Sequence, residues 1–328
     1  MATATPTLPS AGPVAGSRSF LSKLREGDEI ARLITFLFAA TVVLITVLLV
    51  YELWIDSTLA RHKFGWHFFV TQTWDPVMDE YGALPFIYGT LVSSTLALLI
   101  AVPLGIGASI FLAELAPARI SDTLQFFIDL LAAVPSVIYG LLGIFIVVPI
   151  MREWIYPAIN KPLGFLPLFK GPSYGPCFLT AGMVLAIMVI PYIISVSREV
   201  LLSVPRDQRE AALALGSTRW ESTWKVVVPF AKTGIMGSVF LALARALGET
   251  MAVTMVIGNT PKIAASLFAP GYSIAAVIAN EFTEATGELY TQALIGLGLV
   301  LFLLTFILNG LARLLIIVTT QKGSKVSA

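Results

Sequence analysis

Apolar residues gather in long uncharged runs that alternate with short polar segments, and this pattern is typical of a membrane protein. A bilayer core about 30 Å thick needs about 20 consecutive apolar residues in a helix. Five uncharged runs reach this length, at residues 33–51, 81–113, 130–151, 177–197 and 289–312. We predict that each of these runs spans the membrane.

A sixth span is expected at residues 234–258, which are apolar at both ends but carry Arg245 and Glu249 in the middle. The next apolar run is divided by a Pro-Gly pair at 270–271, which leaves two halves that are too short to cross a bilayer. We interpret segment 259–288 as a re-entrant or interfacial hairpin on the outer side. The sequence therefore predicts an all-α polytopic membrane protein with six transmembrane helices.

Lys and Arg residues set the expected orientation, because segments that stay in the cytoplasm carry more of them. With the N-terminus inside, the inner segments hold 14 of these residues and the outer segments hold 6. We therefore expect both termini in the cytoplasm. The expected organisation is a disordered tail and interfacial cytoplasmic segment at 1–29, a transmembrane domain at 30–318 with an outer loop at 52–80 and a cytoplasmic loop at 198–232, and a cytoplasmic tail at 319–328.

The outer loop 52–80 is more aromatic than a simple connector requires. Its large aromatic side chains are Trp54, Phe64, Trp66, Phe68, Phe69 and Trp74. Such side chains either meet an external partner or form an aromatic belt at the membrane–water interface. The sequence leaves both interpretations open.

The composition excludes several other classes of protein. Hydrophobic residues make up 57% of the chain, charged residues make up 12%, and the mean hydropathy is +0.85. A formal net charge of +1 argues against a nucleic-acid partner. The single cysteine, Cys177, excludes an internal disulfide, and His62 and His67 lack the spacing and the third ligand of a metal site. An intramembrane hydrolase is disfavoured because both His residues lie outside the expected spans and Asp129 has no acidic partner within one.

The cytoplasmic loop 198–232 reads as two short helices that meet at a sharp corner. Pro205 suits the first turn of the first helix, and Gly216 suits the left-handed cap that closes it. Thr218 and Glu221 have the spacing of a capping box that opens the second helix. We expect Pro229 to end or bend that second helix.

Small side chains beside the corner would let another protein approach this loop closely. Ala211, Ala212 and Ala214 lie next to Gly216, and charged residues at 206, 209 and 210 flank them. The loop is therefore either a docking element or an ordinary solvated connection.

The same loop resembles the EAA loop of ABC importer permeases. The shared pattern is Glu210-Ala211-Ala212, then Gly216, and then Val226 to Pro229 after nine further residues, with Val in place of the usual Ile and Leu. The resemblance implies that a coupling helix docks on a separate ATPase subunit through Arg209, Glu210, Ala211, Ala212 and Gly216. The chain has no G-x-x-x-x-G-K-[ST] motif, so we expect ATP and Mg on that partner and no cofactor on this chain.

Further stretches resemble the PstC-type permeases of bacterial phosphate importers, and the most specific of them is ALGETMAVTMVIGN at residues 246–259. This resemblance implies a type I ABC importer permease fold in the bacterial inner membrane. It also implies a second, homologous permease subunit, a dimer of ATPase subunits and an extracytoplasmic phosphate-binding protein. The alternative is a permease of the same fold for another oxyanion such as molybdate or sulfate.

Arg245 and Glu249 are the charged residues expected within a span, where an unpaired charge costs about 2.5 to 3.5 kcal/mol. Their i, i+4 spacing lets them form an ion pair that fixes helix packing. The alternative is that the Arg245 guanidinium lines the route of an oxyanion, since its planar fork suits phosphate. Ser136 and Tyr139 follow Pro135 and are candidates either for pore lining at a helix break or for helix packing.

Overall fold

The computed structural model describes residues 28–172 and 174–324, so all but the last two residues of the predicted tail and interfacial segment at 1–29 lie outside the described residues. Within the described part, six helical segments are long and apolar enough to cross a membrane, which confirms the predicted number of spans. They are Ile30–Asp56, Leu84–Leu115, Ser136–Leu163, Phe178–Leu202, Arg219–Leu247 and Glu288–Leu314.

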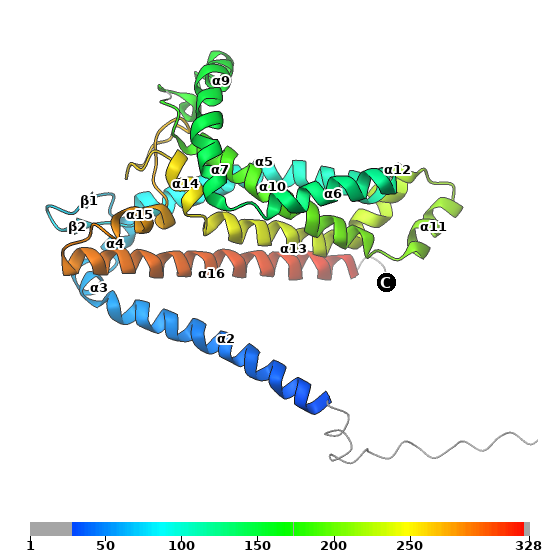
Figure 1. Ribbon diagram of the computed structural model, residues 1–328, viewed down its shortest axis with the longest axis horizontal. Helices are drawn as coiled ribbons and strands as arrows, with labels where there is room; N and C mark the ends of the chain where they lie inside the picture. The colour runs from blue at the N-terminus through cyan, green and yellow to red at the C-terminus, as the bar shows by residue number, and fades with distance from the viewer. Residues whose placement is uncertain (1–27, 173, 325–328) are drawn as a thin grey trace, which may run out of the picture. The chain divides into compact units, whose positions relative to one another are not determined.

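Three of these spans, Leu84–Leu115, Ser136–Leu163 and Arg219–Leu247, consist of several helical elements in series (Figure 1). Four short π-helical turns lie at Phe111–Leu115, Gly143–Val147, Met151–Ile155 and Thr223–Val227, and a 3₁₀ turn lies at Pro167–Phe169. The α-helices and strands in chain order are α2 (Asp28–Asp56), α3 (Thr58–Phe64), α4 (His67–Val70), β1 (Trp74–Asp75), β2 (Glu80–Tyr81), α5 (Leu84–Ile110), α6 (Ala118–Ala132), α7 (Ser136–Leu142), α8 (Val148–Ile150), α9 (Tyr156–Leu163), α10 (Phe178–Leu202), α11 (Arg206–Ala214), α12 (Arg219–Ser222), α13 (Val228–Leu247), α14 (Met251–Val256), α15 (Ile274–Glu281) and α16 (Glu288–Ser324).

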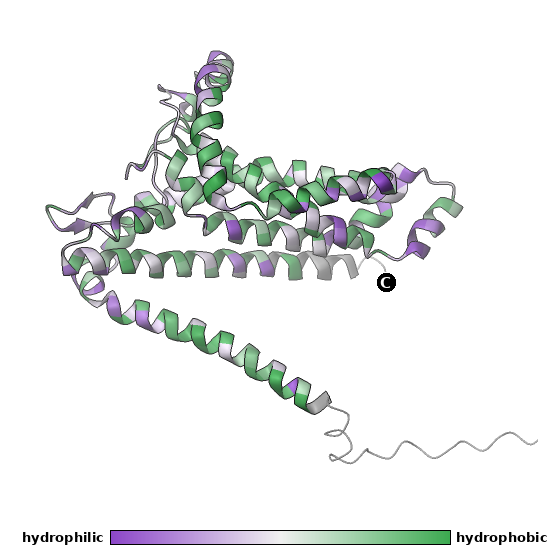
Figure 2. Ribbon diagram, viewed as in Figure 1, coloured by the Kyte–Doolittle hydropathy of each residue, from purple (hydrophilic) through white to green (hydrophobic). Residues whose placement is uncertain are grey.

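The chain divides into two compact units, Met1–Glu52 and Leu53–Ala328. The described part of the first unit is the larger part of α2, an almost wholly apolar helix (Figure 2). α2 begins at Asp28 and runs without a break into the first span, so residues 28 and 29 of the predicted interfacial segment are helical. At the other end of the chain, α16 continues to Ser324, so residues 319–324 of the predicted C-terminal tail are helical.

The core of the second unit is built around α10, which packs along α5, α6 and α13. Glycines permit the closest approaches. A Cβ added at Gly182 would lie 2.6 Å from Leu96 Cβ, and one added at Gly105 would lie 2.7 Å from Ile193 Cγ2. Lipid tails are as apolar as the side chains, so helices in a bilayer associate through this kind of tight packing. Residues in the middle of α10 are accordingly buried by protein.

Aromatic residues of the outer loop form a second core with α15 and the start of α16. Trp74 contacts Tyr81 and Phe86 edge to face, and Tyr81 stacks on Tyr290 at 5.4 Å between ring centroids. Burial, followed by the neighbouring Asp79 carboxylate, raises the pKa of Tyr81 to about 12, so this phenol stays neutral. Many aromatic side chains of the loop therefore pack against one another inside the protein. This internal packing differs from both predicted roles, contact with an external partner and an aromatic belt at the membrane interface.

The segment predicted as a hairpin at 259–288 is helical only in its later part, in α15. Before α15 the chain is irregular, and it lies directly against the N-terminal part of α5. The backbone N–H of Ile274 donates to Thr90 Oγ1 at 3.0 Å, and a Cβ added at Gly89 would lie 2.1 Å from the carbonyl oxygen of Tyr272. These contacts help to bury Tyr272, Ile274 and Gly89.

Candidate substrate pathway and coupling loop

Arg245 lies near the end of α13 with its guanidinium against Tyr192 of α10. Its Nη1 donates to the Tyr192 hydroxyl at 2.9 Å, and the guanidinium carbon lies 4.3 Å from the centre of the tyrosine ring. Nε of Arg245 is buried and has no hydrogen-bond partner among the described residues. The side chain is thus held in place by an aromatic ring while part of its donor capacity stays unused.

The predicted i, i+4 ion pair between Arg245 and Glu249 is not formed within the described residues. The reason is that α13 ends at Leu247, so Glu249 does not continue the same helix. Oε1 of Glu249 instead accepts a hydrogen bond from the backbone N–H of Ala252 at 3.2 Å, at the start of α14. Glu249 therefore caps the N-terminus of α14 after the interruption that follows α13. Arg245 can then interact with groups other than Glu249.

Tyr139 lies at a second helix break, between the end of α6 at Ala132 and the start of α7 at Ser136. Its buried hydroxyl donates to the carbonyl of Leu131 at 2.7 Å, which satisfies an acceptor at the end of α6. Tyr139 also belongs to the same buried cluster as Ala242 and Ala246, the neighbours of Arg245 on α13. Ser136 is half-buried at the first position of α7.

The two broken spans meet each other, because α7 packs tightly on α14. A Cβ added at Gly140 would lie 2.4 Å from Met255 Sδ and 3.2 Å from Ala252 Cα. Non-helical backbone at membrane depth is tolerated only where protein buries it or where it lines a water-filled cavity. The structure thus brings Arg245, Tyr139 and both helix breaks into one region, where a guanidinium and phenol groups are suited to an oxyanion.

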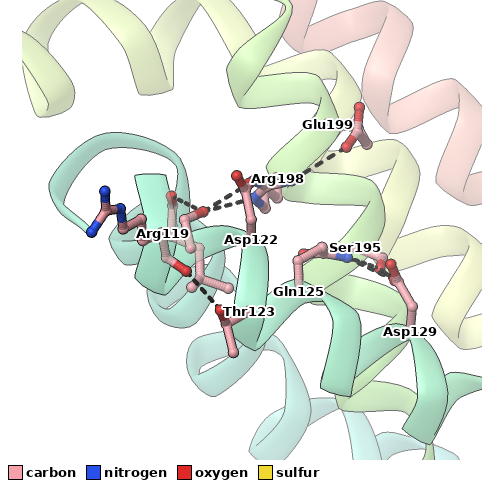
Figure 3. A network of polar contacts seen from close by, with 10 residues as sticks. Arg119, Asp122, Thr123, Gln125, Asp129, Ser195, Arg198 and Glu199 are labelled. Atoms are coloured by element: carbon pink, nitrogen blue, oxygen red, sulfur yellow. Dashed lines mark hydrogen bonds and ion pairs between the residues drawn. The ribbon is translucent and has the colours of Figure 1, made fainter. Parts of the chain in front are cut away.

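Toward the end of α10 that leads to the cytoplasmic loop, a polar network joins α10 to α6 (Figure 3). Gln125 Nε2 donates to Asp129 Oδ1 at 2.7 Å and to Ser195 Oγ at 2.6 Å, and the Ser195 hydroxyl donates to the same carboxylate. One turn further along, Arg198 donates to Asp122 at 3.1 Å. Asp129 is therefore part of a link between α6 and α10.

The cytoplasmic loop has the predicted corner and the predicted cap. α11 is followed by Gly216 at φ +86°, a left-handed conformation that glycine adopts without strain. Thr218 Oγ1 accepts from the backbone N–H of Glu221 at 3.2 Å, and the Glu221 carboxylate accepts from the N–H of Thr218 at 3.0 Å. This reciprocal pair is a capping box.

The second helix of the loop continues past Pro229, which had been expected to end it or to bend it. α12 continues through the π-helical turn Thr223–Val227 into α13, where Pro229 is within the first two residues. Inside a continuous helix a proline removes one backbone hydrogen bond and its ring crowds the preceding turn, and the wider π-helical turn directly before Pro229 accommodates it. One continuous helix of 29 residues therefore runs from the corner at Arg219 to Leu247, and it carries Arg245.

The candidate docking residues differ in their exposure. Glu210, Ala211 and Gly216 are exposed, whereas Ala212 is only 8% exposed and packs inward. Arg209 also points inward, toward Glu114. Leu215, which was not among the predicted docking residues, is 90% exposed beside the corner. A large apolar residue next to a capping glycine could have indicated this exposed position from the sequence.

Comparisons with known proteins agree with this architecture. The family model described as "Binding-protein-dependent transport system inner membrane component" matches residues 101–316. The phosphate transport system permease protein PstC of Mesorhizobium japonicum is 47% identical over 84% of this chain and 86% of its own length. The PstC protein of Xylella fastidiosa is 49% identical over 79% of this chain and 81% of its own length. A solved bacterial ABC transporter that imports alginate has a chain that is 17% identical, with a TM-score of 0.56 over 89% of this chain and 98% of that one, which is a likeness of fold.

Proposed function

Because the chain belongs to the family of binding-protein-dependent transport system inner membrane components, we propose that it is the permease subunit of an ATP-driven importer of inorganic phosphate. It is a multi-pass inner membrane protein with the type I ABC importer permease fold. The observation that carries the substrate is the 47% and 49% identity to two phosphate permeases over about four fifths of the chain. A permease for molybdate or sulfate is the less favoured alternative.

Within this function, Arg245 is the residue that meets the anion, with Tyr139 and Ser136 beside it at the break between α6 and α7. The unused Nε donor of Arg245 and its position among interrupted helices support this role. Glu249 acts on the pathway indirectly, because its carboxylate caps the restart at α14. Arginine offers a planar set of donors that matches two oxygens of a phosphate.

Membership of this family implies an ATPase and a substrate-binding protein as partners in a complex. The finer proposal is a heterodimer with a second homologous permease, a dimer of ATPase subunits that hold ATP and Mg, and a binding protein specific for phosphate. Glu210, Ala211, Leu215 and Gly216 form the proposed ATPase-facing surface of the coupling loop, since they are exposed around its corner.

The proposed orientation places the coupling loop in the cytoplasm and the aromatic core outside. We expect Trp66→Cys to react with a membrane-impermeant maleimide in intact cells and Gly216→Cys to react only after permeabilisation, both in a Cys177→Ala background. Trp66 is 85% exposed, so a thiol at this position is accessible to the reagent. The native Cys177 is buried, and its replacement removes any remaining background labelling. Labelling of both positions from the same side would reverse or reject this topology.

The function is tested in a bacterial strain that lacks its own phosphate importer. Co-expression of this chain with its ATPase, second permease and binding protein should restore uptake of radiolabelled phosphate from a micromolar supply. Leaving out this chain alone should abolish the uptake. Restoration of sulfate or molybdate uptake in place of phosphate uptake would support the alternative.

A further inference from the structure

The guanidinium of Arg209 is held inside the protein, although its position in the coupling loop suggested an ATPase contact. Nη2 lies 2.8 Å from Oε1 of Glu114, and Nε donates to Oε1 and Oε2 at 3.2 and 3.3 Å. The two side chains are 21% and 10% exposed. Such a forked, largely shielded contact is among the stronger and more directional ion pairs in proteins.

The same guanidinium also binds the end of α10. Nη2 donates to the carbonyl of Leu201 at 2.7 Å, and Nη1 donates to the carbonyl of Val204. Carbonyls at a helix C-terminus have no intrahelical donor, and a cation is favoured there. Arg209 therefore joins three segments, namely α11, the end of α10, and the π-helical turn Phe111–Leu115 that follows α5 and carries Glu114.

An apolar cluster beside this contact makes the joint compact. Leu201 and Val204 pack with Ile110 at the end of α5 and with Val227 and Ala231 of the helix that leads to Arg245. The coupling loop is thus attached to the spans in two ways. One is the continuous helix Arg219–Leu247, and the other is the Arg209 contact to α5 and α10.

We propose, on the basis of the function proposed above, that the Arg209–Glu114 pair is a positioning pair that passes movement of the ATPase-bound α11 to the inner ends of α5 and α10. Without it, α11 remains attached through the chain at Pro205 and at the Gly216 corner and through its packing on the π-helical turn Thr223–Val227, but it loses the Arg209 link to Glu114 and to the end of α10. ATP hydrolysis then continues while less of its movement reaches the pathway.

The test replaces the ion pair with a covalent link. In a Cys177→Ala background, Arg209→Cys combined with Glu114→Cys removes the pair, and a bifunctional thiol reagent matched to the span of the original side chains restores a connection. Before cross-linking, we expect the ATPase to stay in the purified complex and phosphate imported per ATP hydrolysed to fall by about fivefold or more. After cross-linking, we expect the ratio to recover toward that of the Cys177→Ala parent.

Two matched variants keep the test decisive. Glu114→Gln is the milder change and should lower the ratio in the same direction if the double variant inserts poorly. Lys225→Gln breaks the exposed Lys225–Glu221 pair of the same loop, 3.3 Å apart, and should leave the ratio unchanged because exposed pairs contribute little.

Three results would overturn the proposal: an unlinked variant with the parent's ratio, loss of the ATPase from the complex, or a cross-linked complex that no longer transports. The second would make Arg209 an ATPase contact, and the third would mean that the two positions separate during the cycle. Failure of the proposed function is distinguishable, since the parent complex would then import no phosphate.

Discussion

Replacing Arg245 with Gln is expected to reduce ATP-dependent phosphate uptake by about 10- to 100-fold, since a hydrogen bond to a charged group contributes about 1.5 to 3 kcal/mol. The side chain is held by Tyr192, and its buried Nε has no partner among the described residues, so the anion gains donors that no other group occupies. Arg245→Lys should transport at an intermediate rate, because the charge remains but the planar fork is lost. The measurement is the initial rate of uptake, normalised to the amount of inserted protein.

Glu249→Gln is the matched control for this prediction. The amide oxygen of Gln can still accept the hydrogen bond from Ala252 N–H, so the restart of the chain at α14 should persist and uptake should change little. If a stably inserted Arg245→Gln variant transported phosphate at the wild-type rate, Arg245 would have no role in the pathway and would serve only to pack α13 against α10.

Replacing Gly216 with Val is expected to leave the protein inserted but to abolish coupled uptake. A non-glycine residue in the left-handed conformation costs about 1 to 2 kcal/mol, and a β-branched side chain resists it further, so the corner between α11 and α12 should rearrange. An added Cβ meets nothing within 4 Å in this chain, so the change should not disturb the chain's own packing. Retention of the ATPase during purification and phosphate uptake are the two readouts.

Gly171→Val provides a control with the same backbone strain at a distant position. Gly171 also has a positive φ, +113°, and open space around an added Cβ, but it lies in the segment between α9 and α10, outside the coupling loop. The ATPase should stay bound to this variant. Equal loss of the ATPase from both variants would show that strain in general, and not the coupling corner, is responsible.

The six spans and the coupling corner were predictable because each depends on local sequence. A span needs only length and low polarity, and the capping box needs only Thr218 and Glu221 at the right spacing beside Gly216. The loop's second helix was also anticipated, with Pro229 expected to end or bend it, but the π-helical turn Thr223–Val227 before the proline was not. Hydrophobic periodicity and capping residues do not predict a π-helical turn that lets a helix continue through a proline.

The site was predicted less completely, because it depends on contacts between distant residues. Arg209 and Glu114 are 95 residues apart, and no local pattern indicates that they meet. The Arg245–Glu249 pair failed for a different reason. The spacing was right for a continuous helix, but α13 ends before Glu249, which turns that residue into a cap for α14.

The most direct test of the account is transport by the purified complex in proteoliposomes, with ATP enclosed on the side of the coupling loop and the binding protein on the other. We expect ATP-dependent accumulation of radiolabelled phosphate that an excess of sulfate or molybdate does not suppress, and no accumulation when this chain carries Arg245→Gln. ATP-dependent accumulation of sulfate or molybdate in preference to phosphate, or phosphate accumulation that does not require ATP, would contradict it.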